Sequence, residues 1–169
     1  MELLSFIKNR VSIRNFSDEP VNLEALKRIL EAGRLAPSAK NRQPWRFIVI
    51  REKELRSRVQ NASFGQNHVG TAPVIIAACT TNVDYRMPNG QLSYPIDISF
   101  AVSSMMLQIE AEGLGSCVVT TFDEREMKDV LSIPYLMKVV MLLLVGHSQE
   151  KPLPTEKKAF DQVISFDHW

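Results

Sequence analysis

The sequence has few cysteines and no long apolar run. Cys79 and Cys117 are its only two cysteines, both lie in apolar stretches, and no CxxC pair is present to hold zinc or an iron–sulfur cluster. We expect both to be reduced core residues, and we expect no metal site. No apolar run approaches the ~20 residues that span a bilayer, and no basic segment precedes the first apolar residues as in a secretory leader. These absences predict a soluble, cytoplasmic protein with no membrane partner.

Net charge is also nearly absent. The 169 residues include 20 basic and 19 acidic side chains, which gives a formal net charge of +1. Bulk electrostatics therefore give no reason to expect a nucleic-acid partner, and any anion must be bound by local groups. A chain of this length, 45% hydrophobic and without visible repeats, is expected to form a single domain over residues 1–169.

A catalytic constellation of side chains is missing as well. His147 is the residue best suited to acid or base chemistry, but no Ser, Cys or carboxylate at a telling spacing accompanies it. A polar residue at the end of a strand is the favoured interpretation, and a role for His147 stays open. We expect no side chain to be catalytic. Dispersed cations, an amide-rich loop and a long apolar helix instead suit a bound cofactor that carries the reaction.

The most informative stretch runs from Pro37 to Trp45, with the sequence PSAKNRQPW. Its two prolines stiffen the backbone, while Ser38, Asn41 and Gln43 supply hydroxyl and amide groups that can pair with the edge of a flat heteroaromatic ligand. The alternative is an ordinary connecting loop, because Ser, Asn and Pro also gather in such loops.

A second stretch, Arg10-Val11-Ser12-Ile13-Arg14, alternates basic or polar residues with apolar ones. If it is extended, period two places Arg10, Ser12 and Arg14 on one face and the apolar pair on the other. Two guanidinium groups around a hydroxyl suit a phosphate, since they form charge-assisted bidentate bonds. A solvated basic edge is the alternative.

Apolar periodicity and capping residues predict an alternation of helices and strands. The helix over 96–112 is apolar almost all round, which indicates burial in a domain centre or a subunit interface. Gly113-Leu114-Gly115 ends it and favours a helix C-cap over a dinucleotide fingerprint. Free backbone N–H groups are expected near Thr121, just before a helix that Asp123 caps. The other expected helices are 2–9, 52–61 and one between the cap Asn22 and Pro37, and the expected strands are 45–50, 74–79, 116–120 and 139–145.

Two further segments lie outside this pattern. Residues 84–94 are polar with turn chemistry, and they form the expected mobile loop. The tail from about residue 150 is first basic and then apolar, so it needs a surface to bury on, and a second subunit is the natural candidate. The apolar residues of the tail are Phe160, Val163, Ile164, Phe166 and Trp169.

Three segments of the chain resemble the FMN-dependent nitroreductase family: APSAKNRQPWRFIVI, Arg10 to Arg14, and Gly113 to Ser116. The three segments occur in the family's order and span nearly the whole chain. The resemblance implies an α+β fold with a central mixed β-sheet flanked by helices, in an intertwined homodimer whose extended C-terminal tail, about 150–169, packs on the partner subunit. It also implies FMN at the dimer interface.

The resemblance assigns roles to individual residues. Arg10, Ser12 and Arg14 would contact the phosphate, ribityl chain and pyrimidine edge of FMN, and Lys157 would add a late basic group on the phosphate. One arginine near the pyrimidine would stabilise the anionic reduced ring. The remaining residues implied at the cofactor are Pro37, Ser38, Ala39 and Asn41 from the partner subunit, Thr120 and Thr121 through backbone N–H at N5, and Gln66 at the pyrimidine edge.

The chain departs from the family pattern at two of these places. Thr121 stands where many members have glycine near N5, and His147 stands where an aromatic residue usually follows the last strand. The chain is also short and lacks the extra helices that larger members place over the ring. The choice between NADH and NADPH, the acceptor and the loop that covers the flavin therefore stay open.

The implied activity is that of an NAD(P)H-dependent flavin oxidoreductase. Such an enzyme takes a hydride from NADH or NADPH and reduces a nitroaromatic, a quinone or a similar small acceptor by a ping-pong cycle. Three alternatives stay open: an FMN carrier or sensor without turnover, a flavin-fragmenting relative on the same fold, and a dimeric interaction domain without cofactor.

Overall fold

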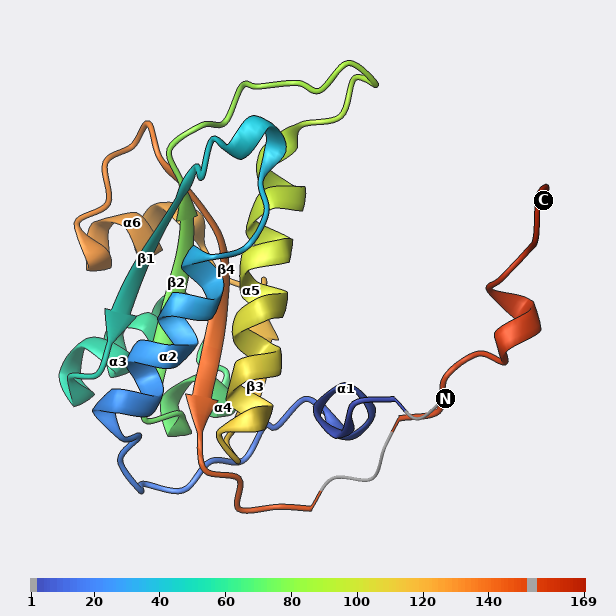
Figure 1. Ribbon diagram of the computed structural model, residues 1–169. Coiled ribbons are helices and arrows are strands. Elements are labelled where there is room, and N and C mark those ends of the chain that lie inside the picture. The colour runs from blue at the N-terminus through green and yellow to red at the C-terminus, as the bar shows by residue number, and fades with distance from the viewer. Residues whose placement is uncertain (1–2, 152–154) are drawn as a thin grey trace.

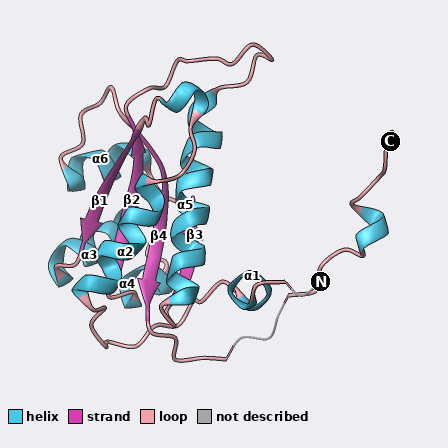
Figure 2. Ribbon diagram, viewed as in Figure 1, coloured by secondary structure: helices cyan, strands magenta, loops and turns pink. Residues whose placement is uncertain are grey.

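A four-stranded sheet lies between two layers of helices in the computed structural model, which describes residues 3–151 and 155–169 (Figures 1 and 2). None of the helices described is both long and apolar enough to cross a membrane. The strands are Trp45–Ile50 (β1), Val74–Thr80 (β2), Gly115–Val119 (β3) and Lys138–Gly146 (β4). The helices are Ser5–Asn9 (α1), Leu23–Arg34 (α2), Lys53–Ala62 (α3), Asn67–Thr71 (α4), Ser93–Ala111 (α5) and Glu124–Leu131 (α6).

The sheet is antiparallel throughout, in the order β1-β2-β4-β3, so the expectation of a mixed sheet is wrong. β2 and β3 run in the same direction, because α5 returns the chain between them (Figure 1). They would form a parallel pair if they were neighbours. Instead β4 lies between them and pairs antiparallel with both.

Each face of the sheet has its own hydrophobic core. α2 and α5 cover one face, where Ile29 and Met105 meet alternate residues of β2 such as Ile76. α3, α4 and α6 cover the other face, where Met127 packs with Ile75. All seven residues of β2 are buried, which is the pattern expected of a strand with helices on both sides.

The helix starts follow the expected capping chemistry. Asn22 Oδ1 accepts hydrogen bonds from the backbone N–H groups of Glu24 and Ala25, at 2.8 and 3.3 Å, so Asn22 caps α2 as expected. Asp123 caps α6 through a 2.9 Å bond from the N–H of Glu126. The helix α4, five residues long, was not expected, because a single turn carries too little periodicity to recognise.

Apolar side chains remain exposed on several parts of the chain, among them α5, the segment of α1 and the tail. Phe100 of α5 is 49% exposed, and α1 exposes Ile7 and the two leucines before it. The tail, residues 155–169, is exposed along its whole length and extends away from the sheet and its helices (Figure 1). Among the described residues, apolar side chains on one side of α5 and in the tail thus remain largely exposed.

Candidate functional site

The segment from Arg10 to Arg14 lies along the free edge of β3. The backbone N–H of Ile13 donates to the carbonyl of Ser116 at 2.9 Å, and Ser12 forms an isolated parallel bridge with Ser116. Ile13 is buried, Val11 packs against the same core and Arg14 is exposed, as the predicted alternation requires, whereas Arg10 and Ser12 are half-buried like Val11. A Cβ atom on Gly115 would lie 2.5 Å from Ile13 Cγ1, so glycine is needed where the two segments meet.

Two cations of this segment have no partner in the part of the chain that the structure describes. Neither the Arg10 nor the Arg14 guanidinium makes a hydrogen bond or an ion pair there. Both lie close enough to act on the pKa of Cys117, which burial raises and which their positive charges partly lower. Burial, and then the charge of Arg14, lower the pKa of His68. The Glu150 carboxylate accepts the backbone N–H of Arg14 at 3.0 Å, but among the described residues no carboxylate forms an ion pair with either guanidinium.

Thr120 and Thr121 follow β3 and leave backbone N–H groups free. The Ser116 carbonyl faces the arginine segment, and backbone groups along a strand repeat their direction every two residues. The N–H of Thr120 therefore faces that same side, away from β4. Neither N–H has an acceptor among residues 3–151 and 155–169. Gln66 lies alongside, since its Nε2 donates to the carbonyls of Thr121 at 2.8 Å and Ser63 at 2.9 Å. Gln66 and Thr121, expected at one ligand, are thus in contact.

Thr120 lies four positions after Ser116, which is about 13 Å along an extended strand. The outer edge of β3 therefore offers cations at one end and, at the other, N–H donors that no described residue accepts. Such a row suits an elongated ligand with a phosphate at one end and a hydrogen-bond acceptor near the other, which fits FMN.

The loop from Pro37 to Asn41 is held in a fixed shape by its own hydrogen bonds. The N–H of Gln43 donates to Ser38 Oγ at 2.9 Å, and Gln43 Nε2 donates to the backbone and side-chain oxygens of Asn41 at 3.2 Å. Lys40, Asn41 and Gln43 all have positive φ, a left-handed conformation that costs energy for residues other than glycine. Ser38, Asn41 and Gln43 thus use part of their hydrogen-bonding capacity inside the loop.

This loop and the arginine segment lie at opposite ends of α5 (Figure 1). The loop contacts the first turns of α5 through Asp97, whereas Ile13 contacts Gly115, just beyond the helix. From Asp97 to Ala111 the axis of α5 is about 21 Å long. Lys157 is separate from both, in the exposed tail, where the cavity that it lines involves only other tail residues.

Asp97 was not singled out from the sequence, although an acidic residue inside an apolar helix is a recognisable exception. Its side chain is 2% exposed, and its Oδ1 accepts a 2.7 Å hydrogen bond from the N–H of Ala39. Its Oδ2 is buried without a donor among the described residues. A buried carboxylate with one hydrogen bond costs stability, so its contribution here is to position the loop.

We expect Asp97→Ala to release this loop. The Ala39 N–H would lose its hydrogen bond to the Asp97 carboxylate, and a hydrogen bond of this kind contributes about 1.5–3 kcal/mol to stability. Native-state hydrogen exchange at Ala39 and Asn41 should therefore become at least about tenfold faster. Asp18→Ala, an exposed change of the same kind, is the control. Unchanged protection of the loop in Asp97→Ala would contradict the positioning role.

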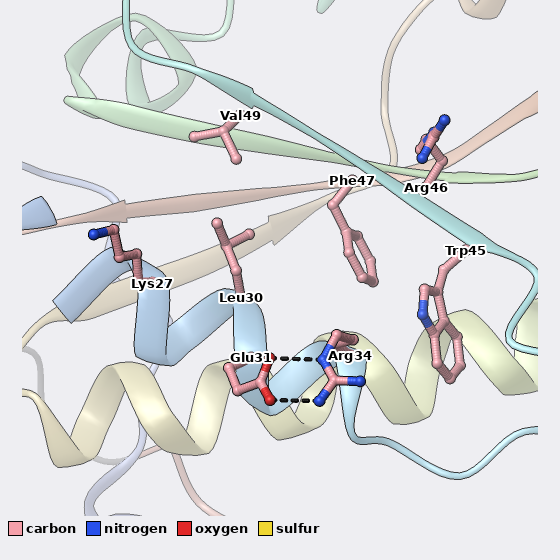
Figure 3. Close-up of a pocket in the computed structure, with 8 residues that line it drawn as sticks. All are labelled: Lys27, Leu30, Glu31, Arg34, Trp45, Arg46, Phe47 and Val49. Atoms are coloured by element: carbon pink, nitrogen blue, oxygen red, sulfur yellow. Dashed lines mark hydrogen bonds and ion pairs between the residues drawn. The ribbon is translucent and has the colours of Figure 1, made fainter. Parts of the chain in front are cut away.

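A separate cavity of about 530 Å³ lies between α2 and the outer strand β1 (Figure 3). Trp45 and Phe47 point from β1 toward α2, and Arg34 and Glu31 close the rim with two hydrogen bonds of 2.7 and 2.6 Å. None of the residues expected at the cofactor lines it. The cavity is lined by Lys27, Leu30, Glu31, Arg34, Trp45, Arg46, Phe47 and Val49.

A family model, a related sequence and solved structures all match this chain over most of its length. Residues 7–73 and 64–147 match the model of the nitroreductase family. A protein of Thermus thermophilus called NADH dehydrogenase is 28% identical over 92% of this chain and 91% of its own length. The crystal structure of a nitroreductase family protein from Clostridium novyi NT is 30% identical, with a TM-score of 0.82 over 90% of this chain and 89% of that one. An FMN-dependent nitroreductase from Clostridium difficile R20291 is 27% identical, with a TM-score of 0.84 over 99% of this chain and 100% of that one.

Proposed function

Since this chain belongs to the nitroreductase family, a family of NAD(P)H-dependent enzymes, we propose that it binds FMN, takes a hydride from NADH or NADPH, and reduces a nitroaromatic, quinone or similar acceptor by a ping-pong cycle. FMN when bound supplies the redox chemistry. One observation carries the proposal: cations and backbone N–H donors that have no partner among the described residues lie along the same edge of β3.

Different residues along this edge of β3 would bind different parts of the cofactor. Arg10 and Ser12 would bind the phosphate end, with Lys157 as a third contact from the tail. Arg14 lies further along β3, toward the N–H groups of Thr120 and Thr121, and would place positive charge near the ring, where negative charge develops on reduction. Gln66 would act mainly by orienting the backbone at Thr121, since its amide is bonded there.

We further propose that the complete site is formed by a homodimer. Pro37, Ser38, Ala39 and Asn41 lie about 21 Å along α5 from the level of the arginine segment, so one chain does not bring the two groups to one ring. A second copy can supply the loop. The exposed Phe100 side of α5 and the apolar tail support this arrangement, because both offer apolar area to a partner.

An anaerobic titration tests the proposed function. The purified protein should show a flavin spectrum, lose it on addition of NADH or NADPH, and recover it on addition of a quinone or a nitroaromatic compound. A flavin that neither dihydronicotinamide bleaches would indicate a carrier or sensor instead. Turnover in which the flavin itself is consumed would indicate a flavin-fragmenting enzyme, and purified protein that binds no FMN would overturn the proposal.

We expect His147→Ala to leave catalysis nearly unchanged. His147 Nε2 lies 3.6 Å from Glu19, an exposed carboxylate, and its carbonyl accepts the N–H of Ser17, so it acts as a strand-end residue in this structure. Positioned general acids typically contribute 10²- to 10⁴-fold. Reoxidation by an acceptor, followed by stopped flow, should therefore stay within about tenfold of wild type. A larger loss in a dimeric variant that still holds FMN would make His147 catalytic.

A further inference from the structure

Two loops far apart in the sequence meet beside the N-terminal end of α5 (Figure 1). One is the loop from Pro37 to Asn41 with Arg42 after it, and the other connects β2 to α5. The Arg42 guanidinium lies 3.9 Å from the centre of the Tyr85 ring, and the Lys40 ammonium lies 5.5 Å from the same ring. These distances fall within the range of cation–π attraction. Tyr85 thus gathers two cations on the surface of the loop proposed to face the flavin.

Both sides of this contact are anchored by backbone bonds. The N–H of Tyr85 donates to Asn82 Oδ1 at 3.2 Å, and its carbonyl accepts the N–H of Ser93 at 3.0 Å. The N–H of Arg42 donates to the Ala39 carbonyl at 3.2 Å, and Ala39 is itself held by Asp97. The two charges are therefore pre-positioned, which lowers the entropy lost when a ligand binds.

These cations keep hydrogen-bonding capacity that the described residues do not use. Within residues 3–151 and 155–169, neither Lys40 nor Arg42 pairs with a carboxylate, and the Arg42 side chain donates no hydrogen bond. Stacking engages the face of a guanidinium and leaves the N–H groups of its edge free. Two adjacent cations with free donors match a ligand that carries two adjacent negative charges.

We propose that Lys40 and Arg42, held over the ring of Tyr85, bind the diphosphate of the reducing dinucleotide, an inference that rests on the proposed function. Nitroaromatic compounds and quinones are commonly uncharged, so the cation pair favours the reductant over the acceptor. Arg42 lies three positions after Ala39, at most about 11 Å along the chain. The diphosphate, which NADH and NADPH share, would thus bind within one short loop of the position proposed for the flavin ring.

The test compares two reductants, one with phosphate and one without. N-benzyl dihydronicotinamide carries the same hydride-donating ring as NADH but no diphosphate. For Arg42→Ala in the FMN-loaded protein, we expect the NADH concentration for half-maximal flavin reduction to rise roughly tenfold. The corresponding concentration of the benzyl compound should not change. Tyr85→Ala should raise the value for NADH about threefold through loss of the platform, whereas Tyr85→Phe keeps the ring and should match wild type.

A binding measurement provides a readout that does not depend on turnover. NAD⁺ titrated into the oxidised protein should bind Arg42→Ala more weakly than wild type, and Arg58→Ala, an exposed arginine on α3, should bind as wild type does. Equal NAD⁺ affinity in Arg42→Ala and wild type would overturn the inference. An equal rise in the half-maximal concentrations of NADH and of the benzyl compound in Arg42→Ala would also overturn it, because it would show a general disturbance of the loop. Failure of both compounds to reduce the flavin would instead overturn the proposed function.

Discussion

Replacing Arg14 or Arg10 with alanine is expected to weaken FMN binding at least about tenfold in each case. A charge-assisted hydrogen bond to phosphate or to an electron-rich ring edge contributes about 1.5–3 kcal/mol, which corresponds to at least about tenfold in affinity. Neither guanidinium makes a side-chain hydrogen bond or an ion pair with any part of the chain that the structure describes. The free energy of unfolding of the apoprotein should therefore stay close to wild type.

This combination separates a binding role from a structural one. FMN affinity is measured by fluorescence titration of the apoprotein, and stability is measured by urea unfolding. Arg58→Ala removes an exposed arginine from α3 and should change neither quantity. Arg14→Lys keeps the charge but loses the planar fork, so its affinity should fall between Arg14→Ala and wild type. If Arg10→Ala and Arg14→Ala both keep FMN at wild-type affinity, the proposed cofactor site is wrong.

Removing residues 159–169 is expected to convert a dimer into a monomer and to abolish FMN binding. This tail exposes five large apolar side chains, whose burial contributes about 1.5–3 kcal/mol each. Two tails in a symmetric dimer would then contribute roughly 15–30 kcal/mol, an upper estimate, against an association cost of about 4–15 kcal/mol. The tail is therefore large enough to decide whether the dimer forms. The side chains are those of Phe160, Val163, Ile164, Phe166 and Trp169.

Sedimentation at low micromolar concentration measures this effect, with and without FMN. The truncation leaves Lys157 in place and keeps the contact between Ser148 and Phe16, so the domain should still fold cooperatively. Asp161→Ala alters an exposed polar residue of the same tail and should remain dimeric. A truncated protein that still sediments as a dimer would place the interface elsewhere, and full-length monomer loaded with FMN would refute the homodimer.

Most of the helices and strands could be predicted from local patterns, because their apolar residues recur at regular spacing and capping residues mark helix starts. Asn22 and Asp123 cap α2 and α6 as expected, and Val11 and Ile13 face the core while Arg14 is exposed. The order of the strands could not be predicted in this way. Whether β2 and β3 are neighbours depends on where β4 inserts, and β4 follows both in the sequence.

The candidate site was predictable where neighbouring residues form it and unpredictable where distant segments meet. The contact between Arg42 and Tyr85 joins two loops with no pattern in common, and the bond from Ala39 to Asp97 joins a loop to a buried helix position. The resemblance alone implies Gln66 at the cofactor, and the position of its side chain depends on a hydrogen bond to Thr121, 55 residues later. Tertiary packing, which local sequence does not record, makes these contacts.

The position of the loop and the arginine segment at opposite ends of α5 has a consequence for inheritance. If each site takes its loop from one chain and its arginines from the other, a defect in either segment damages both sites of a homodimer. In a cell with two alleles, one defective in Arg14 and the other in Asn41, mixed dimers would place both defects in one site. The second site would then be assembled from two sound halves, so two inactive alleles would complement each other.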